Sequence, residues 1–569
     1  MTSQFAIAMN ASAKTWNNAV SLASPDISGK TNGIMSLFFK SVRGINNSQL
    51  YQYISESDKE SIIDTFLLSF YIRDCRGGKG ERKIGREAFT WLLISHPDIF
   101  MKVLHLIPEY GRWDDITHFF PGVLDLSSID NIKSIYNITI DNDHLNKVLE
   151  AQKQIVIFFA DSIKKDYGCM TNGNPCTLAA KWAPTEGDSI DKSSHIFSKL
   201  AHAIGVSNKN LRKVYLTPLR SYINIVEKFM CDGKWNAIEY SKVPSHAMKR
   251  LKKTFEKHDK ERFQQWKEAL KKNDVKVCAK QLQPYEIIRE IRIKKYADEV
   301  LEAQWKILEE EVRKIGYLED AVIVVDTSSS MYTPNYLPLD VAVSLGIIIS
   351  GLTRGKFHNH VITFASEPQF VQIKDGTIYE RWNQVKSIPW GGNTNIQKTF
   401  ELIINRGKAF NLSQNDMPKK LFIISDMQFD QINGEYGSNH ITSFEMIDDM
   451  YKKSGYIRPQ IIFWNVNGNS TDFPASVDDF GTALISGFSP EVMKEVLNGS
   501  DFSPYTIVRN TLDSERFSQI KNVIYASLDK NLQVDIKSST NDVTENDEND
   551  ENNDIVLVTS SMTLHEKYP

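Results

Sequence analysis

Apolar residues recur at helical spacing along the first half of the chain. Segments 61–74, 86–95 and 98–107 place apolar side chains every three or four positions, and Gly, Pro or Asn residues separate such segments. No clear strand pattern interrupts them. We therefore predict an all-α domain over residues 30–317, built from helix hairpins in a HEAT-like array, although no fixed sequence repeat supports a solenoid.

The helical pattern is weak or absent in other parts of the chain. Residues 137–190 are less regular, and NGNP at 172–175 marks a loop within them. The tail, residues 529–569, contains the acidic, Asn-rich stretch 541–554 and few core-forming side chains. Such a composition cannot bury enough apolar surface to fold, so we expect a disordered, solvated tail. Residues 1–29 are treated as an N-terminal arm.

From about residue 318 the pattern changes to short, continuous apolar runs. The strongest runs are AVIVVD (321–326), HVITFAS (360–366), KLFIISD (420–426) and PQIIFWNV (459–466). Amphipathic helix candidates, including 339–352 and 395–406, lie between them. Continuous apolar strands that alternate with helices are typical of a parallel sheet covered on both faces. We therefore predict a doubly wound α/β domain over residues 318–528.

Composition indicates the cellular compartment of the protein but does not identify a binding partner. The 67 basic and 71 acidic residues give a net charge of -4, which favours no polyanionic partner by itself. Five cysteines, an odd number without a CxxC pair, favour a reduced compartment over a disulfide framework. No segment approaches the ~20 apolar residues of a membrane span, and the N-terminus lacks a secretory pattern. We expect an intracellular, cytoplasmic protein; its oligomeric state stays open.

Oxygen-bearing side chains follow the first apolar run. Asp326, Ser328 and Ser330 form a D-x-S-x-S sequence at a strand end, where doubly wound sheets bind their ligands. A carboxylate and hydroxyls are hard ligands that suit Mg²⁺ or Mn²⁺. Thr394, in a glycine-rich loop, and Asp426, at the end of a later strand, would complete an octahedral oxygen site. The alternative is that Ser328 or Ser330 simply caps the next helix.

This set of residues resembles the metal-ion-dependent adhesion site of the von Willebrand factor A domain. In that site, D-x-S-x-S is followed by a threonine in a loop and by an aspartate after a later strand. The resemblance implies that Asp326, Ser328, Ser330 and Thr394 hold the ion directly or through water. It also implies that Asp426 lies in the outer shell of the ion.

An enzyme that uses the same ion is the alternative function. A metal-dependent hydrolase acting on nucleic acid or phosphate esters needs a general base beside the metal, and the loop DTSSSMYTP contains no His, Glu or Lys. The phosphoryl-transfer enzymes that resemble haloacid dehalogenases carry D-x-D after their first strand, whereas this chain has Ser328 at the second position. We therefore favour a non-enzymatic binding protein.

A second chemical feature is the glycine- and lysine-rich stretch RGGKGERKIGR, residues 76–86, at a turn between two predicted helices. Glycines let a phosphate backbone approach closely, and cations bind phosphates without reading sequence. A solvated connection between helices explains the same residues equally well. We call this segment, together with Arg73 just before it, the basic turn. Its six candidate nucleic-acid-binding residues are Arg73, Arg76, Lys79, Arg82, Lys83 and Arg86.

The order of the domains adds two further resemblances. A helical region followed by an A-like domain resembles the Ro 60 kDa autoantigen family, whose helical ring binds misfolded and small structured RNAs. Segments 71–89, 109–116, 178–187 and 242–250 are similar to those of uncharacterised proteins from plants, fungi and giant DNA viruses, a family without an established activity. Together they imply a scaffold that engages a protein or RNA partner, with RNA binding by the helical domain, and a place in the virion if the source is viral.

Overall fold

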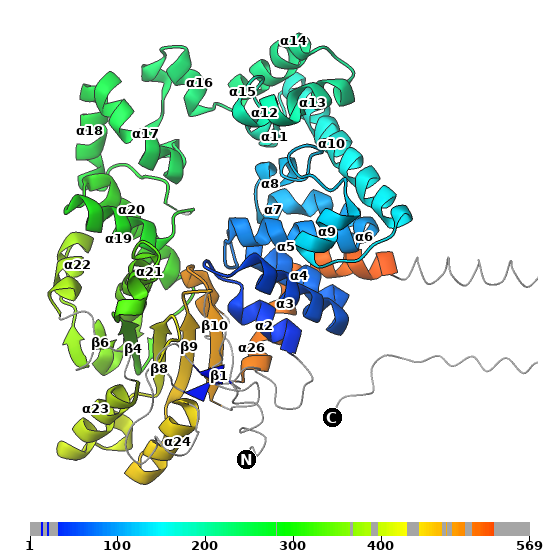
Figure 1. The fold of residues 1–569 in the computed structure, drawn as a ribbon. Coiled ribbons are helices and arrows are strands. Elements are labelled where there is room, and N and C mark those ends of the chain that lie inside the picture. Colours follow the sequence, from blue (N-terminus) through cyan, green and yellow to red (C-terminus); the bar gives the residue numbers. More distant parts are fainter. Residues whose placement is uncertain are drawn as a thin grey trace, which may run out of the picture.

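The protein has an α-helical region followed by a mainly parallel α/β domain, as the sequence predicted (Figure 1). In the described part of the chain, no helix is both long and apolar enough to cross a membrane. The N-terminal arm contributes the paired strands β1 (Ala13–Lys14) and β2 (Val20–Ser21). The tail 529–569 lies outside the described residues. The computed structural model describes residues 13–14, 20–21, 32–279, 281–364, 368–388, 396–429, 443–468, 474, 481–494 and 503–528.

The first helices of the chain pack as a bundle around α4. Ser61 caps α4 by accepting the Asp64 N–H at 3.1 Å, and nearly every later residue of this helix is buried. A helix that is apolar on all sides belongs in a core, which is where α4 lies. These helices are α2 (Asn32–Lys40), α3 (Asn47–Glu60), α4 (Ile62–Arg73), α5 (Arg82–Ser95), α6 (Pro97–Val103), α7 (Ile107–Tyr110), α8 (Trp113–Thr117) and α9 (Ile129–Tyr136).

The segment 137–190 contains α10 (Asn142–Thr171), whose 30 residues make it the longest helix in the described part of the chain. The description of this segment as irregular was therefore wrong for most of it. Apolar residues do recur at helical spacing there, but polar residues outnumber them and conceal the period. The buried apolar side chains of α10 include Val148, Ile155, Phe159 and Ile163.

The rest of the helical region forms two further groups of helices. The short helices that pack near α10 are α11 (Ala179–Trp182), α12 (Ser189–Ser194), α13 (Ile196–Ile204), α14 (Asn208–Asn210) and α15 (Thr217–Tyr222). A second group has a smaller apolar core of its own around Phe255, Phe263 and Trp266. Its helices and those leading to the sheet are α16 (Val226–Cys231), α17 (Ser245–His258), α18 (Lys260–Lys271), α19 (Pro284–Lys294) and α20 (Glu299–Arg313).

The α/β domain is built on a six-stranded sheet, counted over the described residues, with the order β10-β9-β8-β4-β6-β7. Neighbouring strands are parallel except for the edge strand β7, which runs antiparallel to β6. The four predicted strands are confirmed, and β7 and β10 are additional. The strands are β4 (Ala321–Asp326), β6 (His360–Phe364), β7 (Gln369–Gln372), β8 (Lys420–Ser425), β9 (Gln460–Asn465) and β10 (Thr482–Ser486).

The strand order creates a switch point beside β4. The chain leaves β4 for β6 and β7 on one side, then returns to β8 on the other side of β4. Connections that diverge in this way leave a crevice at the carboxyl ends of the two strands. The helices of the domain are α21 (Leu337–Ser350), α22 (Ile378–Ser387), α23 (Ile396–Ala409), α24 (Ser443–Ser454) and α26 (Pro504–Leu512).

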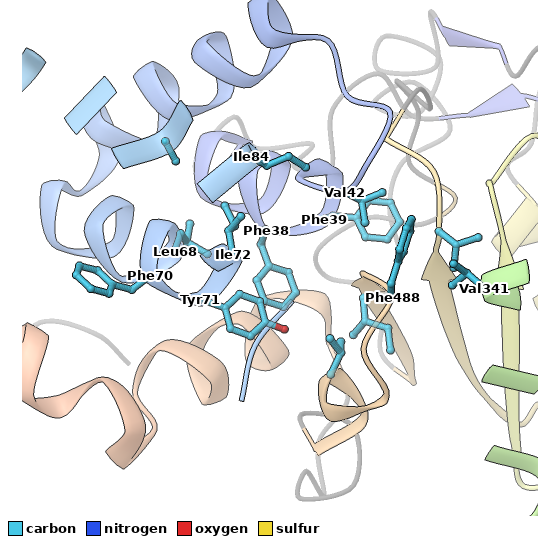
Figure 2. Packing of buried hydrophobic residues seen from close by; sticks show 14 of the residues in the cluster. Phe38, Phe39, Val42, Leu68, Phe70, Tyr71, Ile72, Ile84, Val341 and Phe488 are labelled. Carbon is cyan, nitrogen blue, oxygen red and sulfur yellow. The ribbon is translucent and has the colours of Figure 1, made fainter. Parts of the chain in front are cut away.

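The helical region and the α/β domain share one hydrophobic core. Phe39 of α2 lies close to Phe488, which follows β10, and Phe38 stacks on Tyr71 of α4 (Figure 2). Helix α21 is buried along nearly its whole length because it lies between the sheet and α19. Helix α26 in turn contacts α2, α4 and β10. The two parts are therefore expected to unfold together.

Ion pairs reinforce this junction at its edge. Arg516, beyond α26, donates to both carboxylate oxygens of Asp74 at 2.8 and 3.0 Å, and the Asp74 side chain is fully buried. Arg509 makes the same kind of two-pronged contact with Asp64, at 2.8 and 3.1 Å. The C-terminal helices are thus fastened to α4 and to the residue that follows it.

We predict that Asp74→Ala lowers the free energy of unfolding by about 2 to 3 kcal/mol, less than for a fully buried pair because Arg516 is partly exposed. Urea unfolding followed by circular dichroism measures this change. The control is Glu150→Ala, which removes an exposed carboxylate paired with Lys153 on the surface of α10 and should change nothing measurable. Equal effects of the two variants would show that the Asp74 pair does not join the domains.

Candidate functional site

The D-x-S-x-S loop begins at the carboxyl end of β4, at the switch point, and we refer to this place between the ends of β4 and β8 as the crevice. Asp326 is fully buried, and its Oδ1 accepts the Ser328 N–H at 2.9 Å, which turns the chain sharply after the strand. This turn brings the Ser328 and Ser330 hydroxyl oxygens to 3.0 Å from each other. One carboxylate and two hydroxyls from five consecutive residues therefore lie together.

Asp426 enters the same place from β8. It is 2% exposed, it accepts the Gln428 N–H at 3.2 Å, and the Ser330 side chain also hydrogen-bonds to it. The preceding residue, Ser425, donates its hydroxyl to the second oxygen of Asp326 at 2.5 Å. The structure thus brings together four of the five sequence-predicted site residues, at the ends of two adjacent parallel strands.

The electrostatics of the two carboxylates are unfavourable without a cation. Burial raises the pKa of Asp326, and burial together with the negative charge of Asp326 raises the pKa of Asp426 to about 7. In the described part of the chain, no Lys, Arg or His forms an ion pair with either residue. Each carboxylate oxygen offers two lone pairs, so the hydrogen bonds above leave capacity for a metal ion.

The predicted ligand Thr394 lies outside the described residues. Among the described residues, no group of three or more His, Cys, Asp and Glu side chains has the arrangement of a metal site. Among the described residues, the oxygens that an ion could meet here belong to two carboxylates and to neutral hydroxyls. Hydroxyl and carboxylate oxygens are ligands that suit Mg²⁺ or Mn²⁺. They suit Zn²⁺ less well, because zinc prefers nitrogen and sulfur ligands.

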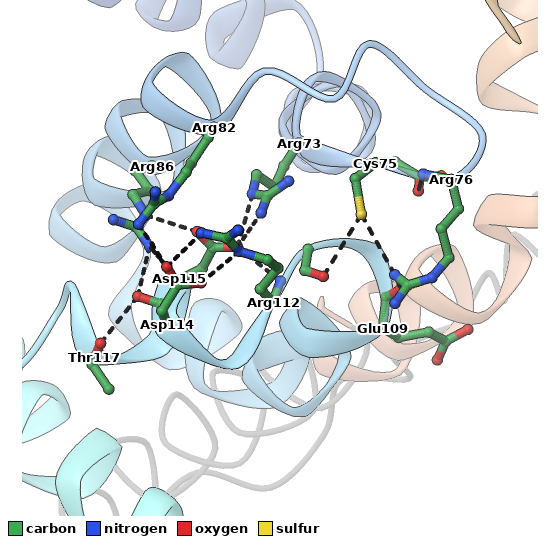
Figure 3. Close-up of polar contacts among 12 residues, drawn as sticks. Arg73, Cys75, Arg76, Arg82, Arg86, Glu109, Arg112, Asp114, Asp115 and Thr117 are labelled. Atoms are coloured by element: carbon green, nitrogen blue, oxygen red, sulfur yellow. Dashed lines mark hydrogen bonds and ion pairs between the residues drawn. The ribbon is translucent and has the colours of Figure 1, made fainter. Parts of the chain in front are cut away.

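In the basic turn, acidic residues of α8 pair with three of the arginines (Figure 3). Arg73 is buried and contacts Asp115 at 2.6 Å, and Arg86 contacts the other oxygen of Asp115 at 2.7 Å. Arg82 reaches Asp114 at 2.6 Å. These contacts hold the turn between α4 and α5 against α8. Two neighbouring aspartates thus serve three of the candidate RNA-binding arginines.

Lys79 of the basic turn is completely buried at the junction with the sheet. Its Nζ donates to the Ser486 hydroxyl of β10 at 2.7 Å, to the Ser41 hydroxyl at 3.1 Å and to the Phe38 carbonyl. Burial lowers the pKa of Lys79 to about 7. This lysine is therefore a contact between the helical region and the α/β domain, inaccessible to a phosphate backbone.

Close packing explains two of the glycines of the basic turn. A Cβ on Gly78 would lie 2.2 Å from the Tyr71 carbonyl oxygen, and one on Gly85 would lie 2.7 Å from the Arg73 Cβ. Neither distance allows a larger residue. Exposed cations remain at Arg76, Arg82 and Lys83, and phosphate binding by the turn stays a prediction for these residues.

Comparison with known proteins agrees with this division of the chain. Residues 320–540, which contain the crevice residues, match the model of a domain of unknown function, DUF7788, and residues 138–318 match that of another, DUF2828. The chain is similar to both of these families. It is also 28% identical over 497 residues, 83% of each chain, to uncharacterized protein L728 of Acanthamoeba polyphaga mimivirus. This distant homology confirms the predicted likeness to giant-virus proteins.

Two tyrosines follow the D-x-S-x-S loop along the chain, within the DUF7788 match, and we call them the rim. The ring centroids of Tyr332 and Tyr336 are 5.2 Å apart, and Tyr336 is 45% exposed. Arg292 of α19 lies over the Tyr336 ring at 4.7 Å and binds both oxygens of Asp340 at 2.7 and 2.9 Å. The helical region thereby fixes Tyr336 and the first turn of α21.

Sequence reasoning missed the residues that support the crevice. Ser425 stands directly before Asp426, and a hydroxyl at a strand end beside a candidate ligand was a usable signal. The contribution of Arg292 had no such signal, because it comes from the other domain, 48 positions away from Asp340.

We predict that the burial of Lys79 makes stability depend on pH. Because its folded pKa of about 7 lies below the ordinary 10.5, the folded chain binds fewer protons than the unfolded chain between these values, so stability rises with pH there. From about pH 7 to about pH 9.5, Lys79 alone should add about 3 kcal/mol to the free energy of unfolding. Urea unfolding at both pH values measures it.

The Lys79→Met variant provides the comparison, since methionine has a similar length and no titrating group. Its stability should lack this component of the pH dependence. Parallel pH profiles for the wild type and Lys79→Met would mean that the buried ammonium keeps its proton, and would contradict the prediction.

Proposed function

We propose that the α/β domain binds one Mg²⁺ or Mn²⁺ ion in the crevice between β4 and β8 and uses it to hold an acidic side chain of a protein partner. The observation that carries the proposal is the meeting of two buried carboxylates and two hydroxyls, with no ion-pairing cation among the described residues. A bound cation would remove the repulsion between the carboxylates. Asp326, Ser328 and Ser330 are the proposed ligands, with Thr394 and with Asp426 in the outer shell.

Because few of the proposed ligands are negatively charged, the bound ion would attract an anion. An ion held by one direct carboxylate and several neutral oxygens keeps net positive charge, and it accepts a further negatively charged oxygen in place of water. This is how the metal-ion-dependent adhesion site of the von Willebrand factor A domain, which the crevice resembles, engages a partner. The ion would supply the attraction, and the loop 329–336 would supply the surrounding contacts.

The rim supports a protein as the partner. Tyr and Arg are enriched in the parts of protein interfaces that contribute most binding energy, and Tyr336 and Arg292 lie side by side at this rim. Residues 333–336 are exposed, so a docking surface is accessible around the crevice. An RNA phosphate is the other anion that an ion of this kind attracts, and the experiments below distinguish the two.

We predict that the full-length chain binds a single Mn²⁺ or Mg²⁺ ion, measured by titration calorimetry after treatment with EDTA. Asp326→Ala should abolish binding because it removes the one direct carboxylate. The control Asp416→Ala removes an exposed carboxylate of the same domain, paired with Lys356, and should leave binding unchanged. Absence of divalent binding by the folded wild-type chain would refute the metal site.

We further predict that proteins retained from a native extract on the immobilised chain in Mg²⁺ are released by EDTA. Thr394→Ala and Tyr336→Ala should each weaken retention, through the ion and through the rim respectively. Retention that EDTA does not change would give the ion a structural role only. Retention that is lost both in EDTA and after nuclease treatment would identify RNA as the partner of the ion. Metal-dependent cleavage of phosphate esters, removed by Asp326→Ala, would establish the hydrolase alternative.

A further inference from the structure

A large hollow lies between two groups of helices in the helical region, away from the metal crevice. Its volume is about 1250 Å³, above the roughly 300 to 1,000 Å³ of sites that enclose a small molecule. The α7–α8 turn and α11 form one wall, while the segments flanking α17 and α18, together with α20, form the other. These two groups stand on opposite sides in Figure 1. We call this feature the central hollow.

The lining of the central hollow is strongly cationic. Two glutamates, Glu310 and Glu311, face two arginines and five lysines there. Such an excess of one sign in a concave surface raises the local concentration of oppositely charged ligands. The lysines are Lys181, Lys242, Lys276, Lys306 and Lys314.

Most of this positive charge is not neutralised by neighbours. Within the described chain, Lys181, Lys276 and Lys306 form no ion pair. Lys314 is paired at the exposed surface with Glu311, at 2.7 Å, and Lys242 with Glu239, also at 2.7 Å. Exposed pairs of this kind are weak, so both lysines can exchange their partners for a phosphate. The hollow therefore differs from the part of the basic turn around Arg73, Arg82 and Arg86, which meet the carboxylates of α8, although Arg76 of that turn also lines the hollow.

Aromatic rings lie among these cations. Trp113 and Trp182 both line the hollow and are partly exposed. Arg112 lies over the Trp182 ring at 4.5 Å and is itself fixed by Asp114 at 2.7 Å. Indole and guanidinium planes are the surfaces on which nucleic-acid bases stack. The hollow thus combines contacts for phosphates with contacts for bases.

We propose that the central hollow binds a single-stranded nucleic acid, with the lysines on the phosphates and Trp182 stacked on a base. A concave surface suits a single strand, because a double helix is read by elements that project into its grooves. An acidic peptide would use the lysines but not the rings. The binding requires no metal and is independent of the crevice between β4 and β8, so EDTA leaves it unchanged.

The test is fluorescence anisotropy of the full-length chain with labelled oligomers of about twelve nucleotides, within the usual range of single-strand sites. Affinity should fall steeply with salt, because each phosphate contact on a single strand contributes about 0.7 to the slope of log K against log salt. Replacing Lys242, Lys276 and Lys306 by glutamine should reduce the slope by about 2. All three side chains are exposed, so the variant should fold.

A matched control removes three exposed lysines that lie outside the hollow and form no ion pair in the described chain, and it should leave the slope unchanged. The control variant replaces Lys147, Lys165 and Lys213 by glutamine. Equal losses in the two triple variants would overturn the proposal, because binding would then follow net charge alone. If the wild-type chain bound neither an RNA nor a DNA oligomer at low salt, the proposal would also be overturned.

Three further ligands test the role of the bases. Oligo-U and oligo-dT of equal length distinguish RNA from DNA as the source of the strand, and preference for either is compatible with the site. An abasic oligomer of the same length should bind about tenfold more weakly, in line with the loss of stacking. Trp182→Leu should remove this difference and Trp182→Phe should preserve it. Binding of polyglutamate as tight as that of the oligonucleotides would overturn the assignment in favour of an acidic peptide.

Discussion

A charge that leaves water needs a partner, and this constraint shapes both halves of the molecule. In the basic turn, buried Arg73 meets Asp115, and buried Lys79 is surrounded by oxygen acceptors. In the crevice, buried Asp326 and Asp426 receive hydroxyl and N–H donors but no ion-pairing cation from the described residues. In the first arrangement the Arg73 charge is paired with Asp115, while Lys79 has only neutral acceptors and burial lowers its pKa to about 7. The second becomes complete only with a proton or a bound ion, which is the basis of the proposed metal site.

Much of the fold was predictable because its elements follow simple periods. The run AVIVVD corresponds residue for residue to β4, since a strand buried on both faces reads as a continuous apolar run. Strand β10 is equally buried but has only five residues, and this short run was not recognised. Helix α10 is long, but it was not recognised because most of its surface is polar. Periodicity therefore detects elements that are long and well buried, and misses those that are short or mostly solvated.

The candidate site was predictable where its residues lie close together in the sequence or at the ends of adjacent strands. Ser328 and Ser330 stand two and four residues after Asp326, and the rule that parallel strands end at the same edge brings Asp426 beside them. The role of the basic turn could not be predicted in this way, because it depends on residues far away in the sequence. Lys79 is held by Ser486, 407 positions away, and Arg73 by Asp115, 42 positions away. A cationic motif thus looked like a phosphate site because its partners are remote in sequence.

The measurement that tests the metal site most directly is crystallography of the full-length chain with Mn²⁺, using the anomalous signal of the metal. An ion at the proposed site should give one anomalous peak in the crevice between β4 and β8, about 2 Å from oxygens of Asp326, Ser328 and Ser330, as for small hard cations. The same crystals would show whether Thr394 supplies a further oxygen. A peak elsewhere, or a crevice without metal at saturating Mn²⁺, would contradict the account.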